Sequence, residues 1–97
     1  MADITGSTDV GGGVSIAYDV NPTAPSAKLT LKFEGQSLGS ATINSSDASA
    51  SIGGSYAGTG VKATVTANWS TDKITYSVKL NPPVGKTTTY NGTVVSW

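Results

Sequence analysis

The chain has 97 residues, enough for one domain, with six basic and six acidic residues that cancel and are scattered along it. It contains neither histidine nor cysteine, which excludes a Ser-His-Asp triad, a cysteine nucleophile and a histidine- or cysteine-ligated metal site within one chain. Without a basic stripe, we expect no nucleic acid partner and no membrane insertion.

The first predicted strand follows an ambiguous N-terminal segment. Residues 1–12 are either flexible or an edge strand, and the glycine run 11–13 is interpreted as a flexible lead-in. From Val14 to Val20, apolar and polar residues alternate, which predicts a half-buried strand. Asn21-Pro22 ends it, because proline cannot continue a hydrogen-bonded ladder.

The segment 28–44 predicts the first hairpin. Leu29, Leu31 and Phe33 share one face of its first arm. Gly35-Gln36 fits a tight turn, and the spacing of the return arm predicts a bulge near Gly39-Ser40. A weak strand of small residues follows at 48–52. We expect it at a sheet edge, ending at Gly53-Gly54 before a loop over 55–60 with Tyr56 in its middle.

The segment 61–80 gives the clearest pattern and predicts the second hairpin. Apolar residues recur at every second position on both arms, and a turn falls at 70–72. Residues 81–85 then form a proline-containing loop. The last segment, 87–97, is one strand or a strand pair, with Asn91-Gly92 as a bulge or as a two-residue hairpin turn. We favour one bent strand, because the flanks are short.

These elements predict an all-β fold: an antiparallel β-sandwich of seven or eight strands, in a single domain over residues 1–97, with a small β-barrel as the alternative. No segment has a helical period. The predicted core is the inward set Val14, Ile16, Leu29, Leu31, Phe33, Val65, Ile74, Tyr76 and Val78.

The sequence limits the cellular compartment and the catalytic chemistry of the chain without fixing the compartment. The N-terminus shows no signal peptide and no apolar run reaches membrane-spanning length, so we expect a soluble chain, either cytosolic or a mature secreted domain with an added Met. Paired carboxylates are the one enzymatic option, but turn chemistry and a solvent-facing strand end explain Asp47, Asp72 and Glu34. We therefore expect no enzyme activity, no cofactor and no metal.

Carbohydrate recognition is the leading functional hypothesis. Charged residues make up only 12% of the chain, so polar contacts come from hydroxyl and amide groups, and aromatic residues lie near turns where they could stack on a sugar ring. Trp69 and Tyr56 are the proposed stacking residues, although core packing is the commoner role for Trp69. The candidate binding residues are Trp69, Tyr56, Asn44, Asp47, Asn68, Asp72, Tyr90 and Asn91.

A structural or protein-interaction domain is the competing hypothesis, for example an adhesin subunit, a decoration domain or a protease inhibitor. Such domains use an exposed edge strand or a rigid loop for contact, and the loop 81–85 is a candidate. In either case we expect a homodimer or a higher homo-oligomer, because a small cysteine-free domain gains stability by burying surface.

Overall fold

The computed structural model describes residues 3–97, which form eight β-strands and no helix. In chain order the strands are β1 Ile4–Gly11, β2 Val14–Asn21, β3 Ser26–Phe33, β4 Gln36–Asn44, β5 Ser49–Tyr56, β6 Thr59–Asn68, β7 Lys73–Asn81 and β8 Thr88–Ser96. No helix in this range could cross a membrane.

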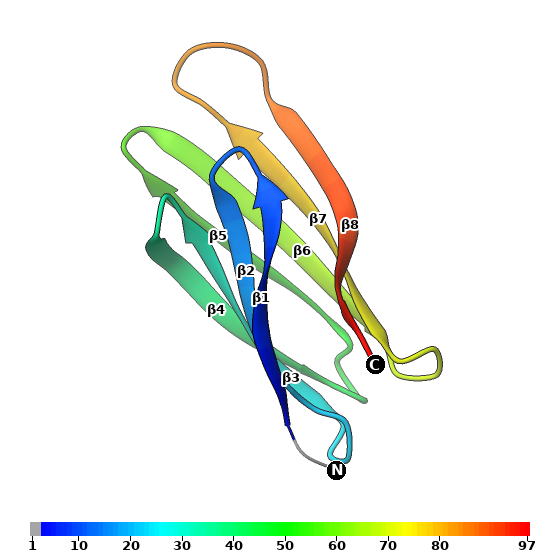
Figure 1. The fold of residues 1–97 in the computed structure, drawn as a ribbon. Coiled ribbons are helices and arrows are strands. Elements are labelled where there is room, and N and C mark those ends of the chain that lie inside the picture. The colour runs from blue at the N-terminus through cyan, green and yellow to red at the C-terminus, as the bar shows by residue number, and fades with distance from the viewer. Residues whose placement is uncertain (1–2) are drawn as a thin grey trace.

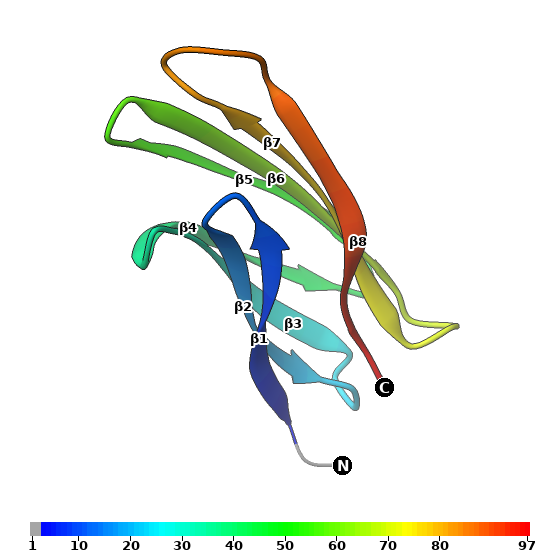
Figure 2. The same ribbon diagram turned by 45° about the horizontal axis from the view of Figure 1, so that its top comes forward.

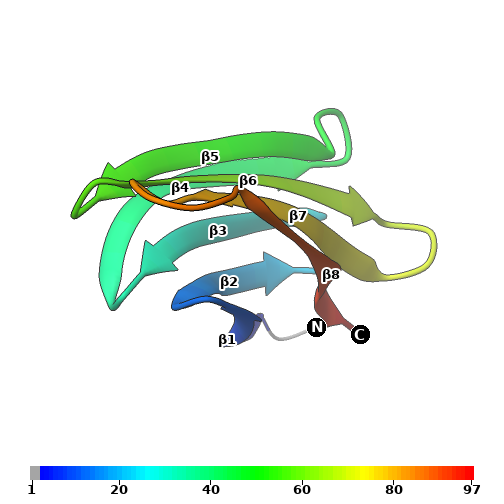
Figure 3. The same cartoon turned by 90° about the horizontal axis from the view of Figure 1, so that it is seen from above.

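The strands form two antiparallel four-stranded sheets, ordered β1-β2-β3-β4 and β5-β6-β7-β8 (Figure 1). We call them sheet A and sheet B. Each is a simple meander, and Figure 3 shows them stacked as two layers. The predicted antiparallel sandwich is confirmed, with eight strands. The barrel alternative is wrong, because no ladder joins the two sheets within residues 3–97.

The sheets meet along two seams where edge strands contact each other without a ladder. At one seam β4 lies against β5, and at the other β1 lies against β8. At the second seam, the Tyr90 ring of β8 lies so close to the β1–β2 turn that a methyl group added at Gly11 would meet it at 3.0 Å. The outer edge of each sheet is therefore unpaired and lies beside the unpaired edge of the other sheet.

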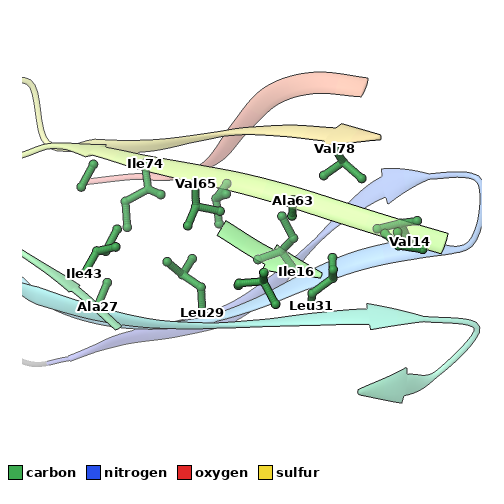
Figure 4. Packing of buried hydrophobic residues seen from close by; sticks show 14 of the residues in the cluster. Val14, Ile16, Ala27, Leu29, Leu31, Ile43, Ala63, Val65, Ile74 and Val78 are labelled. Atoms are coloured by element: carbon green, nitrogen blue, oxygen red, sulfur yellow. The ribbon is translucent and has the colours of Figure 1, made fainter. Parts of the chain in front are cut away.

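The core lies between the layers and receives eight buried residues from each sheet (Figure 4). Alternation accounts for this, because every second side chain of a strand faces the same side. All members of the predicted core are buried except Tyr76, which is half-buried and packs against the others. The buried residues are Val14, Ile16, Val20, Ala27, Leu29, Leu31, Phe33 and Ile43 from sheet A, and Ile52, Val61, Ala63, Val65, Ala67, Ile74, Val78 and Val94 from sheet B.

A tyrosine covers a glycine on the outermost strand of each sheet. Tyr18 of β2 is paired with Gly6 of β1, and Tyr76 of β7 is paired with Gly92 of β8. A methyl group added at Gly6 would lie 2.7 Å from the Tyr18 hydroxyl, and one at Gly92 would lie 2.6 Å from the Tyr76 hydroxyl. These edge positions therefore require glycine, because the inward tyrosine ring occupies the space above them.

The glycine run is a turn rather than a flexible lead-in. Residues 4–11 form edge strand β1, and Gly11, Gly12 and Gly13 have φ values of 121°, 61° and 86°. These left-handed conformations suit glycine and reverse the chain between β1 and β2. Residues 1–2 of the expected N-terminal segment lie outside the described range. Residues 4–11 form an edge strand, which is one of the two predicted alternatives for this segment.

Four other local predictions differ from the observed strand boundaries and register. β5 continues through Gly53-Gly54 to Tyr56, so the expected loop 55–60 is wrong; Ala57 and Gly58, both with positive φ, form a two-residue turn. The β3–β4 turn is Glu34-Gly35, one residue earlier than predicted. The bulge is also earlier, because the register shift leaves Leu38 without a partner on β3. The last segment is one strand, β8, as predicted, but the irregularity expected at Asn91-Gly92 is wrong, because both residues are in register and the shift leaves Val94 without a partner on β7.

Candidate functional site

The two proposed stacking residues lie at opposite ends of an elongated molecule. An up-and-down strand order places the β5–β6 turn, which follows Tyr56, at the end opposite the β6–β7 turn, which contains Trp69 (Figure 2). The longest dimension of the domain is 44 Å. Tyr56 and Trp69 therefore cannot contribute to one compact sugar site within a single chain.

Each of these aromatic side chains packs on a neighbouring ring. Trp69 is half-buried against the core, with its ring centroid 5.7 Å from that of Trp97, and its indole Nε1 is buried without a hydrogen-bond partner in residues 3–97. Tyr56 makes an edge-to-face contact with Phe33 at 6.3 Å and is 41% exposed. The inward pattern of β5 continues to Tyr56, which places it at the open end of the core.

The asparagines of the predicted turn sites organise the turns themselves. The Asn44 Oδ1 accepts hydrogen bonds from the backbone N–H groups of Ser46 and Asp47, at 2.9 and 2.8 Å. The Asn68 Oδ1 accepts from Ser70 and Thr71 in the same way, at 3.0 and 3.1 Å. These are Asx-type turns, in which the side chain replaces a backbone carbonyl.

Backbone groups of the two aspartates also hold these turns. The Asp47 carbonyl accepts the N–H of Asn44, and the Asp72 carbonyl accepts the N–H of Trp97, each at 2.9 Å. Asp72 has a φ of 58°, a left-handed conformation that aspartate tolerates in turns. Asn44, Asp47, Asn68 and Asp72 thus share one end of the domain with Trp69, and turn geometry uses one polar group of each.

Tyr90 and Asn91 point to opposite sides of β8. Tyr90 is half-buried and lies over the glycines of the β1–β2 turn, whereas Asn91 is exposed on the outer face, paired with Ser77 of β7. Of the predicted binding residues, Asn91 alone belongs to the three rows of the outer surface of sheet B described next.

The outer surface of sheet B carries an array of hydroxyl groups in register across its four strands. One row runs Ser49, Thr66, Thr75, Thr93 and the next runs Ser51, Thr64, Ser77, Asn91. Adjacent hydroxyls are linked, with 3.2 Å between Ser49 Oγ and Thr66 Oγ1, and 3.4 Å between Ser51 Oγ and Thr64 Oγ1. A third row runs Gly53, Lys62, Lys79, Thr89. We call these three rows the hydroxyl face.

Three hollows join along the hydroxyl face. The largest, about 590 Å³, has a floor of glycine at Gly53, Gly54 and Gly60 and extends to Asn81 and Thr87. The smallest, about 130 Å³, is enclosed by Lys62, Thr64, Ser77 and Lys79. The third, about 490 Å³, lies between Thr66, Thr75 and Thr93. The small hollow shares both lysines with the first and shares Thr64 and Ser77 with the third, so the three adjoin one another along the sheet. We call this row of hollows the track.

Sequence reasoning missed this face because its residues occupy the polar positions of an amphipathic strand. Such positions are assigned to solvent unless their neighbours on other strands are known. The signal that could have found it is the repetition of Ser and Thr on the polar face of four successive strands. Comparison of the chain with protein-family models, with curated proteins and with solved structures gives no match.

Proposed function

We propose that this domain binds carbohydrate through the hydroxyl face of sheet B. The supporting observation is the track of three adjoining hollows, of which half the lining residues are Ser, Thr and Asn and the rest include glycines, Lys62 and Lys79. A sugar carries several hydroxyl groups, each of which donates and accepts hydrogen bonds. Hydroxyl and amide side chains have the same dual capacity, so they match such a ligand.

The rigidity of the face favours binding over mere solvation. The hydroxyl groups project from interior strands β6 and β7 as well as edges β5 and β8, and ladder hydrogen bonds hold the backbone that carries them. A preorganised array loses less conformational entropy on binding than side chains on a mobile loop. The two rows of hydroxyls can therefore hold a ligand without first being ordered.

The length of the track favours an oligosaccharide. From Thr75 to Asn81 along β7 the track covers six residue steps, which correspond to about 20 Å at the rise of an antiparallel strand. A chain of several sugar units lying along the strands would contact all three hollows. Stacking by Trp69 or Tyr56 is not needed for this mode, since both rings lie at the ends of the domain.

A titration of ¹⁵N-labelled protein with neutral and acidic oligosaccharides, monitored by two-dimensional NMR, tests the proposal. We expect amide shifts on β6 and β7 around Thr64 and Ser77. In Thr64→Val/Ser77→Ala, loss of two hydrogen bonds should weaken binding about tenfold. Thr30→Val, on the outer face of interior strand β3 of sheet A, is the matched control and should bind normally.

Three outcomes of this titration are informative. Shifts confined to the turns at Trp69 or next to Tyr56 would support the stacking site and contradict the hydroxyl face. Equal loss in Thr30→Val would indicate a nonspecific effect. Absence of shifts with every sugar class would remove carbohydrate binding altogether.

The seam between β1 and β8 favours a second candidate, a structural or protein-interaction domain. Neither strand is paired on its outer side, and β8 contains no proline and no charged residue that would discourage strand addition. A partner strand, including one from a second copy, would add to this edge. Mass measurement in solution across a range of protein concentrations distinguishes an oligomer from a monomer.

A further inference from the structure

The charges of the chain separate between its two halves. Residues 1–48, which include all of sheet A, contain five acidic residues and two lysines, a formal net charge of −3. Residues 49–97, which include all of sheet B, contain four lysines and one acidic residue, a formal net charge of +3. Within the strands, two acidic residues and two lysines balance in sheet A, whereas sheet B has three lysines and no acidic residue, so sheet B is basic.

Two of the four lysines of this half are direct neighbours on the hydroxyl face. Lys62 of β6 and Lys79 of β7 are paired in register, and both are exposed. Like charges directly opposite each other on a sheet destabilise it. The single acidic residue of this half, Asp72, lies in the β6–β7 turn, about 23 Å from Lys79 along β7 at the rise of an antiparallel strand.

The surroundings of the lysine pair supply no compensating carboxylate. Its row continues to Gly53 on one side and Thr89 on the other, and the next row contributes Thr64 and Ser77. The acidic residues Asp9 and Asp19 are on β1 and β2 of sheet A, across the core. An anionic group between the two lysines would therefore relieve their mutual repulsion.

The 130 Å³ hollow between these four side chains has the chemistry of an anion site. The side chains of Lys62, Lys79, Thr64 and Ser77 line it, and they carry two ammonium and two hydroxyl groups that can all donate hydrogen bonds. Charge-assisted hydrogen bonds to an anionic oxygen are stronger than neutral ones. The hollow occupies the middle of the track, so an anion there would belong to a longer ligand that also reaches the outer hollows.

We infer that the ligand of the hydroxyl face is an acidic polysaccharide, with a carboxylate or sulfate group seated between Lys62 and Lys79. This inference rests on the proposed carbohydrate function and specifies its ligand class. Carboxylate and sulfate share the required chemistry, a compact anion with several acceptor oxygens on a sugar ring. The flanking hydroxyl rows bind the neutral parts of the same chain.

The experiment compares polysaccharides that differ in charge alone. Polygalacturonate is paired with its fully methyl-esterified form, and dextran sulfate with dextran, each titrated calorimetrically at low and high salt. We expect at least one acidic member to bind about tenfold or more tightly than its neutral partner, because charge-assisted bonds are lost in the latter. This difference should shrink at high salt, which screens exposed charges.

Variants connect the charge preference to the lysine pair. Lys62→Gln/Lys79→Gln should lose the preference for the acidic member while retaining the folded NMR spectrum. Lys28→Gln/Lys32→Gln removes two lysines from the outer face of β3 in sheet A and is the matched control. It should keep the preference, although the net charge of the chain changes equally. Equal losses in both double variants would overturn the assignment.

The outcomes separate this inference from the proposed function. Equal binding of acidic and neutral members would overturn the acidic ligand and leave carbohydrate binding intact. Binding to none of the four polysaccharides, nor to the sugars of the NMR titration, would remove both. Polyaspartate is the polyanion control; if it competes as well as the acidic polysaccharide, the face attracts charge in general and the inference is wrong.

Discussion

Sheets A and B have the same plan and differ on their outer surfaces. Both are four-stranded meanders, both give eight residues to the core, and both place an inward tyrosine over a glycine on the outermost strand. On sheet A, however, the outer rows hold two acidic residues and two lysines among their hydroxyl groups, and Asp19 faces Lys28. On sheet B the outer rows hold hydroxyls, an amide and lysines without an acidic residue. Folding alone does not require an outer face without acidic residues, because sheet A forms the same architecture with acidic residues on its outer face.

The largest expected effect tests whether the sheets are one cooperative unit. Leu29→Ala in sheet A and Ile74→Ala in sheet B each remove a fully buried side chain, so each should lower the free energy of unfolding by about 2–5 kcal/mol. Because the core is shared, far-UV circular dichroism and tryptophan fluorescence should report one transition in both variants. Both tryptophans follow strands of sheet B. A fluorescence transition that stays unchanged in Leu29→Ala would show that sheet B is stable alone.

A smaller effect tests whether the two tyrosine–glycine pairs stabilise their sheets to a similar extent. Gly6→Ala and Gly92→Ala should each destabilise the fold by roughly 1–3 kcal/mol, because the new methyl group displaces Tyr18 or Tyr76. The closest atom at Gly92 is the Tyr76 hydroxyl, so Gly92→Ala/Tyr76→Phe should recover part of the loss. Chemical denaturation measures all of these variants. Strict additivity of the two changes would contradict the packing explanation.

The smallest expected effect compares one lysine substitution on each outer face, because the two substitutions should change stability in opposite directions. Lys79→Gln should raise the free energy of unfolding by roughly 0.2–1 kcal/mol, since it relieves repulsion with Lys62. Lys28→Gln should lower it by a similar amount, since Lys28 faces Asp19. Paired denaturation curves at low and high salt measure both, and the difference should fade as salt screens the charges. Destabilisation by Lys79→Gln would indicate that Lys79 has a compensating partner.

Alternation in the sequence predicted most of the fold. The two hairpins, the bent last strand and eight of nine predicted core residues follow from period-two patterns, because a strand with one buried face must alternate. Errors arose where glycine obscured the pattern. β5 continues through Gly53-Gly54, and the glycine run 11–13 turns the chain, because glycine carries no hydrophobicity signal. Local turn chemistry gave the right turns at Asn21, Asn44 and Asn68, where side-chain oxygens bind the backbone.

The candidate site was less predictable. Single aromatic residues near turns suggested a stacking site. Their contacts with Phe33 and Trp97, however, depend on strand order, as does the separation of Tyr56 and Trp69 at opposite ends of the domain. The hydroxyl face depends on register: Ser51, Thr64, Ser77 and Asn91 are separate polar residues in the sequence and neighbours only in the sheet. A shift of one residue in any strand would turn those side chains into the core.

The sequence by itself determined the chemistry available to this protein. The absence of histidine and cysteine excludes the chemistry of those side chains, and the sparse charge leaves hydroxyl and amide groups as the commonest polar contacts. Tertiary structure decided where those groups meet. Register brings Lys62 beside Lys79 next to rows of hydroxyls on the outer face of sheet B. The physical reason is that the chemistry of a side chain is set by the residue itself, whereas a binding surface on a sheet needs side chains from several neighbouring strands.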